Sequence, residues 1–454
     1  MNLAIFRVVL LGLGALPFAW RTLQWTEHAL PGLPRDAWRP VSFYAYLPLD
    51  VLADARLARW LVLADLAMIA LALVGVFTRW TCAAAAILSL YVFGLAQNQG
   101  KVDHCHHLVW FMALVAAGPS DRFLSVDALV AAIRRSDRMV SSAAALTTLR
   151  CVWILFGLLY LGPGMAKLAS AITDGWASEA NLRRIVWLQW LWRILYQPDF
   201  VPWRWVDATP AWVVVGSGLA VIAFESSFIV LVLIRRARPW LAAAGILFHA
   251  VNGFVLGIWF AFLIPAYVAL IDWVALGRAF ARRRSPDERT GVASGRRTVL
   301  AVGGALIAAQ LVATVMRTSS RASSIGSWWP FDSYPTFSRP RSAQAIVWEA
   351  RAVLRSGAQH PLSPHAWARA FGSPGRCRRA TADILDIGDP TRRRTRSQAA
   401  VERLWRHEAI EVRSQGIAVA VYEVHYALGP TPQVASERLL DRFAAESLGP
   451  KRPR

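Results

Sequence analysis

Long apolar stretches alternate with short polar connections over the first 316 residues. A membrane-crossing helix needs about 20 apolar residues, and nine stretches reach or approach that length. They cover residues 3–20, 57–77, 81–97, 106–118, 149–168, 211–234, 241–256, 260–276 and 299–316. The stretch 106–118 is the shortest. The pattern predicts an all-α polytopic membrane bundle of about nine transmembrane helices.

The basic residues between these stretches predict an orientation. With the N-terminus inside, the inner loops 78–80, 119–148, 235–240 and 277–297 hold 15 basic residues, and the longer outer loops hold 9. Cytoplasmic loops are enriched in arginine and lysine. We therefore expect the N-terminus in the cytoplasm. Without the short helix 106–118, the arginine-rich loops 235–240 and 277–297 would lie on the outer side. The charge rule therefore also favours that helix.

The composition changes after residue 316. Residues 317–454 contain no further apolar stretch and carry 22 basic against 12 acidic side chains. Periodicity predicts helices at 343–355, 398–410 and 434–445 and a strand at 417–428. We expect three regions: a membrane domain (1–280), a basic cytoplasmic loop with the last transmembrane helix (281–316), and a small α+β extracytoplasmic domain (317–454).

The overall composition excludes disorder, because 56% of the 454 residues are apolar and only 17% are charged. A net charge of +21 raises the question of nucleic acid. The arginines instead lie in membrane loops and in the C-terminal region, so we expect no nucleic-acid partner. The basic runs 376–379 and 392–396 fit a surface facing solvent or anionic lipid. Segment 181–197 fits an interfacial helix or a core-facing amphipathic one.

Ionisable side chains are densest in GKVDHCHH, residues 100–107. These are Lys101, Asp103, His104, His106 and His107. One interpretation is a polar turn between two helices, and another is a metal site, although the i, i+4 pairing of a helical zinc motif is missing. A third is an acid/base cluster, because burial beside cations moves a lysine toward its neutral form, which is a usable base.

Other polar groups lie inside the apolar stretches. Lys167 follows a Gly-Pro-Gly segment, which predicts a helix kink with a lysine reaching the interface. His249 and Asn252 are one helical turn apart, as in an interhelical hydrogen bond. The mid-span acids Asp65 and Glu225 require partners. We expect structural ion pairs for them, with Arg7 as one partner.

Several of these segments, in this order, resemble the HTTM (horizontally transferred transmembrane) domain of vitamin K-dependent gamma-carboxylase and its bacterial relatives. The segments are AIFRVVLLG (4–12), GKVDHCHHLVWFMAL with GPSDRFLSVDAL (100–129), YLGPGMAKL with DGW (160–176) and FHAVNGFVLGIWF (248–260). Together they span about 60% of the chain. The Ala/Arg-rich composition indicates a bacterial plasma-membrane protein.

The resemblance implies quinol chemistry at the outer face. In the carboxylases a lysine deprotonates vitamin K hydroquinone, whose oxidation by oxygen yields a base strong enough to remove a glutamate γ-proton. Lys101 falls at the place of that lysine, and His107 matches the histidine that follows it. We expect His106, Lys167, His249 and Asn252 to contact the substrate. The implied cofactor is a reduced naphthoquinone of the vitamin K type, with membrane lipid as the other partner.

The chain departs from the family at two places. Residues 103–106 differ from the small and amide residues of the carboxylases, which leaves the tuning of Lys101 open. Region 317–454 is shorter than the carboxylase luminal region and lacks any resemblance to a propeptide site, which argues against a recruited peptide substrate. Two hypotheses follow: a quinol-dependent epoxidase or carboxylase, and a non-catalytic membrane anchor whose basic outer domain binds a protein partner or anionic lipid.

Overall fold

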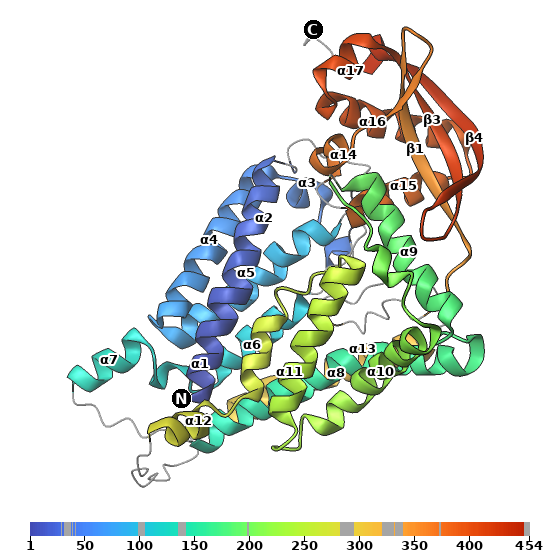
Figure 1. The fold of residues 1–454 in the computed structure, drawn as a ribbon. Coiled ribbons are helices and arrows are strands. Elements are labelled where there is room, and N and C mark those ends of the chain that lie inside the picture. The colour runs from blue at the N-terminus through green and yellow to red at the C-terminus, as the bar shows by residue number, and fades with distance from the viewer. Residues whose placement is uncertain are drawn as a thin grey trace.

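The computed structural model describes most of the chain. The described residues are 1–28, 30, 38, 40, 42–98, 105–134, 142–197, 199–281, 295–319, 331, 339–371 and 374–448. They form a helical bundle and, beyond the end of the bundle that lies away from the N-terminus, a small C-terminal domain with an antiparallel sheet (Figure 1). This arrangement agrees with the predicted helical bundle followed by an α+β domain.

Among the described residues, seven helical segments are long and apolar enough to cross a membrane. They are α1 (Asn2–Val9) continued by η1 (Leu10–Ala15) and α2 (Leu16–His28); α4 (Ala55–Val74); α5 (Thr78–Leu95); α8 (Ser142–Asp174); α10 (Ala211–Leu231); α11 (Arg238–Val251) continued by η8 (Asn252–Leu256); and α13 (Arg296–Ser319). Shorter helices are α3 (Leu49–Leu52), α6 (His106–Ala117), α7 (Val126–Ile133) and α12 (Trp273–Ala281). Eight of the nine predicted stretches are therefore helical.

The prediction of a continuous helix over residues 260–276 is wrong. It contains a 3-10 helix, η9 (Ile264–Leu270), which begins beside Pro265, and then α12. A proline lacks the N–H that a regular helix needs. Side chains of η9 such as Ala266 and Tyr267 are buried, so other helices surround this irregular segment.

Local sequence explains where the helices begin and end. The side chain of Asp54 accepts hydrogen bonds from the N–H groups of Arg56 and Leu57 and so caps α4. Gly75 then ends α4 in the left-handed conformation, at φ 78°. α8 and α10 pack closely because Gly157 and Gly164 lie two turns apart on α8. A Cβ at Gly164 would lie 2.8 Å from the carbonyl carbon of Glu225.

Polar contacts join several turns at the end of the bundle that holds the N-terminus. Asn2 Nδ2 donates to Asp272 Oδ1 at 3.1 Å, and Arg235 Nη2 lies 2.8 Å from Asp272 Oδ2. Arg7 donates to the carbonyl oxygen of Ser120 at 2.9 Å, and Asp127 accepts from the N–H of Thr78. The turns that the sequence assigns to the inner side therefore lie at one end of the bundle.

The C-terminal domain is a four-stranded antiparallel sheet in the order β2-β1-β3-β4, with helices packed against one face. Its strands are β1 (Gln344–Leu354), β2 (Gln359–Pro361), β3 (Gly416–Ala427) and β4 (Gln433–Ala444). Its helices are α14 (Pro364–Phe371), α15 (Pro374–Leu385), α16 (Pro390–His407) and α17 (Ile410–Gln415). Trp348 and Val421 from the sheet pack with Leu404 in the core.

Two secondary-structure predictions for this domain are right and two are wrong. The strand 417–428 is β3, and the helix 398–410 is the second half of α16. The segments 343–355 and 434–445, predicted as helices, are β1 and β4. Both pair with β3 along almost its whole length, and this non-local pairing outweighs local helix preference.

The amphipathic segment 181–197 forms α9 (Glu179–Tyr196), which belongs to both parts of the molecule. Leu191 and Tyr196 lie in the core of the C-terminal domain, whereas Leu182 and Ile185 pack with bundle residues. The core-facing interpretation of this segment is therefore the correct one.

Candidate functional site: a cavity between four helices

A cavity of about 440 Å³ lies between α8, α9, α10 and α11. This volume falls in the usual range for small-molecule sites. Most of its wall is apolar and includes Leu159, Leu182, Val214 and Phe248. The polar groups in the wall are few and are contributed by several elements. Such a cavity suits an amphiphilic ligand with a small polar head.

A buried ion pair forms one polar part of the wall. Lys167 Nζ on α8 lies 2.7 Å from Oε2 and 3.0 Å from Oε1 of Glu225 on α10. Both side chains are only 6% exposed. The pairing explains how two charges can lie within apolar spans, because each one offsets the desolvation of the other. Lys167 is paired inside the bundle, so the prediction that its side chain reaches the membrane interface is wrong.

Tyr160 and His249 form the second polar part of the wall and belong to a hydrogen-bonded chain of three rings. Tyr160 Oη on α8 lies 2.6 Å from His249 Nε2 on α11 and 2.5 Å from Tyr267 Oη on η9. All three side chains are buried. A phenol between an imidazole and another phenol can pass a proton along these contacts, because each of these groups both donates and accepts.

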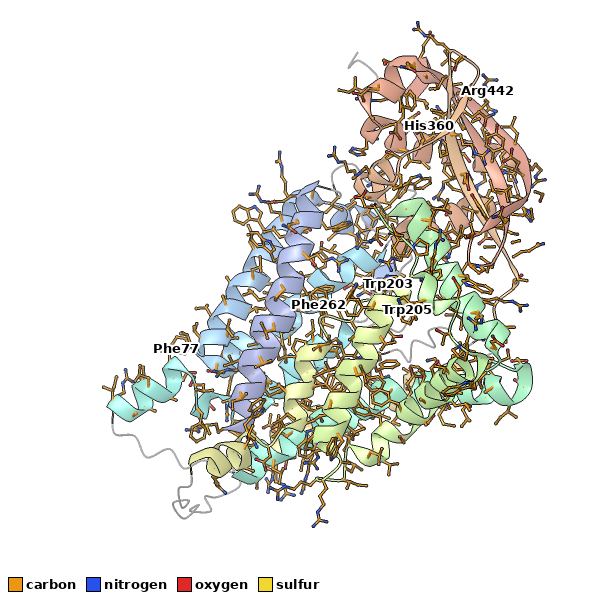
Figure 2. The ribbon with its side chains drawn as sticks, viewed as in Figure 1. Phe77, Trp203, Trp205, Phe262, His360 and Arg442 are labelled. Carbon is orange, nitrogen blue, oxygen red and sulfur yellow. The ribbon has the colours of Figure 1, made fainter. Side chains whose placement is uncertain are left out.

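Hydrogen bonds from α9 hold the segment 204–209 over one side of the cavity. Arg183 on α9 donates to the carbonyl oxygens of Val206, Asp207 and Thr209 at 3.2, 3.1 and 2.6 Å. Trp187 Nε1 donates to Asp207 Oδ1 at 2.7 Å. The exposed ring of Trp205 projects beside that of Trp203, as Figure 2 shows. Aromatic residues of this kind are typical of a membrane–water interface.

Three of the six predicted site residues line this cavity. Lys167, His249 and Asn252 come from two apolar stretches and meet in one wall. His249 bonds to Tyr160 on α8, which is an interhelical hydrogen bond of the predicted kind.

His106 and His107 are buried on α6 and do not line the cavity. The ring of His106 packs against Trp110, with centroids 4.6 Å apart. His107 Nε2 lies 2.9 Å from the carbonyl oxygen of Phe262. Phe262 is flanked by residues that line the cavity, including Leu263, so His107 supports its wall. Lys101, with Asp103 and His104, lies outside the described residues.

The predicted partners of the mid-span charges are partly wrong. Glu225 forms an ion pair, but with Lys167. Asp65 accepts a hydrogen bond from Ser89 Oγ at 3.0 Å, and Arg7 donates to backbone carbonyl oxygens. The four cysteines are buried, and none of them forms a disulfide among the described residues. No group of three or more potential metal-ligating side chains occurs in the part of the chain that the structure describes.

Sequence reasoning missed Tyr160 and Tyr267. A signal for Tyr160 was present, because it opens the YLGPGMAKL segment seven residues before Lys167 and therefore lies on the same face of α8. Tyr267 gave no comparable signal, since the residues around it in 260–271 are all apolar. In comparisons with known proteins, no family model, curated protein or solved structure matches the chain.

Proposed function

We propose that the chain is a multi-pass membrane protein that binds a reduced naphthoquinone-type quinol in the cavity between α8, α9, α10 and α11. The observation that supports this proposal is the composition of the cavity wall. Most of the wall is apolar and suits an isoprenoid chain, and it is interrupted by the Lys167–Glu225 pair and the Tyr160–His249 contact. A quinol presents two hydroxyl groups on an apolar ring, and both polar parts can bond to hydroxyls.

The proposed chemistry follows the HTTM resemblance. Lys101 would act as the base that deprotonates the quinol, and His107 would support it while holding Phe262. Oxidation of the quinol by oxygen would then give epoxidase or carboxylase chemistry. Asn252 and His249 would orient the ring of the quinol from α11. The C-terminal domain would position α9, which contributes both to its core and to the cavity wall.

We further propose nine membrane passes, with the N-terminus in the cytoplasm and the C-terminal domain outside the bacterial plasma membrane. The arginine-rich inner loops motivate this orientation. The segment 257–272 would be an irregular pass that contains only the short 3-10 helix η9, which membranes tolerate where the backbone is enclosed by protein. The burial of Leu263, Ala266 and Leu270 meets that condition.

Labelling tests the orientation. His360 is exposed in the C-terminal domain, and Arg236 is exposed at a turn near Asp272. In intact spheroplasts, a membrane-impermeant maleimide is expected to label His360→Cys and to leave Arg236→Cys unlabelled until lysis. The reverse pattern would invert the proposed topology.

The enzymatic proposal is tested with purified protein, reduced naphthoquinone and oxygen. Wild type is expected to form quinone epoxide, and Lys101→Ala is expected to lose this activity while its tryptophan fluorescence is still quenched on quinol binding. Equal epoxide yields from both proteins would reject Lys101 as the base. Absence of both binding and epoxide in wild type would favour the non-catalytic anchor.

A variant with a narrower cavity tests whether the quinol binds there. Val214 lines the cavity from α10, about three helical turns before Glu225, and Val214→Phe narrows the cavity without removing a polar group. Quenching is expected to weaken in this variant. Unchanged binding in Val214→Phe would mean that the quinol occupies another site.

A further inference from the structure

Tyr160, His249 and Tyr267 form a hydrogen-bonded network that joins three elements of the bundle, and we call it the three-ring network. Tyr160 lies on α8, His249 on α11 and Tyr267 on η9. Tyr160 and His249 line the cavity, whereas Tyr267 does not line it and is only 1% exposed. A ligand in the cavity can therefore reach Tyr160 and His249 directly, and Tyr267 acts on it only through Tyr160.

A glycine on α11 makes room for the phenol of Tyr267. A Cβ at Gly245 would lie 2.2 Å from the hydroxyl oxygen of Tyr267 and equally close to two of its ring carbons. Only a residue without a side chain lets the ring approach the helix backbone this closely. Gly245 precedes His249 by four residues and lies on the same face of α11. The helix that carries His249 therefore also sets the position of Tyr267.

The hydroxyl hydrogen of Tyr267 points toward Tyr160. In the part of the chain that the structure describes, the Tyr267 hydroxyl bonds to Tyr160 alone, with 2.5 Å between the two oxygens. If Tyr160 donated to Tyr267 instead, the hydrogen of Tyr267 would be buried without an acceptor, which is costly. Tyr267 is therefore the donor in this contact, and Tyr160 is the acceptor.

This donor leaves the hydrogen of Tyr160 for the other neighbour. The hydrogen cannot point at Tyr267, which already donates to Tyr160, and Nε2 of His249 lies 2.6 Å from the Tyr160 oxygen. A phenol oxygen can both donate and accept, so it can still receive a hydrogen bond from a ligand. A ligand hydroxyl that donates to Tyr160 would complete a line of hydrogen bonds from the ligand through Tyr160 to His249.

We propose that Tyr160 passes the proton of one quinol hydroxyl to His249, and that Tyr267 is the positioning residue that turns the hydrogen of Tyr160 toward His249. The O–H bond of the quinol breaks as an O–H bond forms at Tyr160, and the former hydrogen of Tyr160 moves to Nε2 of His249. The products are a quinolate, hydrogen-bonded by Tyr160, and a protonated His249. The inference rests on the proposed quinol site but not on Lys101, because a quinol has a second hydroxyl for that base.

Binding of a naphthol to the purified full-length protein in neutral detergent tests the relay. A naphthol has one hydroxyl on the same two-ring skeleton and needs no oxygen, and its ionised form absorbs at a longer wavelength than its neutral form. At neutral pH, wild type is expected to bind the naphthol partly in the ionised form, whereas the naphthol in protein-free detergent stays neutral. The absorption spectrum gives the ratio of the two forms, and tryptophan quenching gives the affinity.

Matched variants separate positioning from packing. Tyr267→Phe is expected to lower the ratio of ionised to neutral naphthol about tenfold at nearly unchanged affinity, since one hydrogen bond contributes about this factor. Gly245→Ala keeps the hydroxyl of Tyr267 but displaces it, and a similar fall is expected. Tyr160→Phe is expected to abolish the ionised form and serves if the other two variants do not fold. Tyr196→Phe removes a phenol from the core of the C-terminal domain and is expected to leave the ratio unchanged.

The outcomes distinguish this inference from the quinol proposal. A naphthol that binds to wild type only in its neutral form would overturn the relay and leave the quinol site standing. An unchanged ratio in Tyr267→Phe, or an equal fall in Tyr196→Phe, would overturn the role of Tyr267. If wild type binds neither the naphthol nor the quinol, the quinol proposal fails and this inference fails with it.

Discussion

The molecule handles buried positive charge differently in its two parts. In the bundle, Lys167 has Glu225 within 2.7 Å, so the pair is neutral and complete. In the C-terminal domain, Arg403 is almost equally buried, and its charged neighbours are other arginines. The first arrangement offsets both charges within the bundle, whereas in the second the guanidinium of Arg403 lies over the ring of Phe371.

This difference separates two kinds of site. A neutral internal pair can line a cavity for an uncharged, amphiphilic molecule without repelling it. A surface rich in arginine attracts anions, and this attraction weakens as salt is added. The two regions therefore present different chemistry, although α9 packs against both the bundle and the C-terminal domain.

The largest effect is expected from breaking the internal pair. Lys167→Met leaves Glu225 without a partner among apolar spans and is expected to lower the free energy of unfolding by about 3–5 kcal/mol. The measurement is denaturant unfolding in detergent. Lys167→Met/Glu225→Leu, which removes both charges, is expected to recover most of that loss.

An exposed pair supplies the control for this experiment. Arg59 and Glu27 lie 3.3 Å apart with side chains 60% and 35% exposed. Arg59→Met is expected to cost less than about 1 kcal/mol, because solvent screens such pairs. If the double variant at Lys167 and Glu225 were as unstable as the single variant, the lost packing would matter more than the charge.

The bundle was largely predictable from the sequence because its signal is local. Helices long and apolar enough to cross a membrane, such as α4 and α10, need a continuous apolar run. A run of this kind is visible without knowing its neighbours. The prediction of a regular helix over 260–276 was wrong because it also used only the local apolar run. The segment is equally apolar, but its burial inside the bundle permits a 3-10 helix beside Pro265.

The C-terminal strands and the polar contacts of the cavity depend on non-local pairing. β4 has most of its side chains exposed and reads locally as a helix, and only its pairing with β3 makes it a strand. Likewise, Lys167 and Glu225 are 58 residues apart, and Tyr160 and Tyr267 are 107 apart. The sequence indicated that the mid-span acids needed partners, but the partner it suggested, Arg7, donates to backbone carbonyl oxygens instead.

The smallest expected effect concerns His407, which follows Arg406 at the end of α16. Burial lowers its pKa from the ordinary value of 6.5, and Arg406, Arg403, Arg369 and Arg413 lower it further. The unfolded chain then takes up the proton more readily, so stability is lost as the pH falls through 6.5 toward the lower folded-state pKa, and the group has no effect above this window.

Because His407 is largely exposed, this loss is expected to be only a few tenths of a kcal/mol. It is measured as the difference in melting temperature between wild type and His407→Gln from pH 7.5 to pH 5.5. A difference that does not change with pH would mean that His407 has the same pKa in the folded and the unfolded chain.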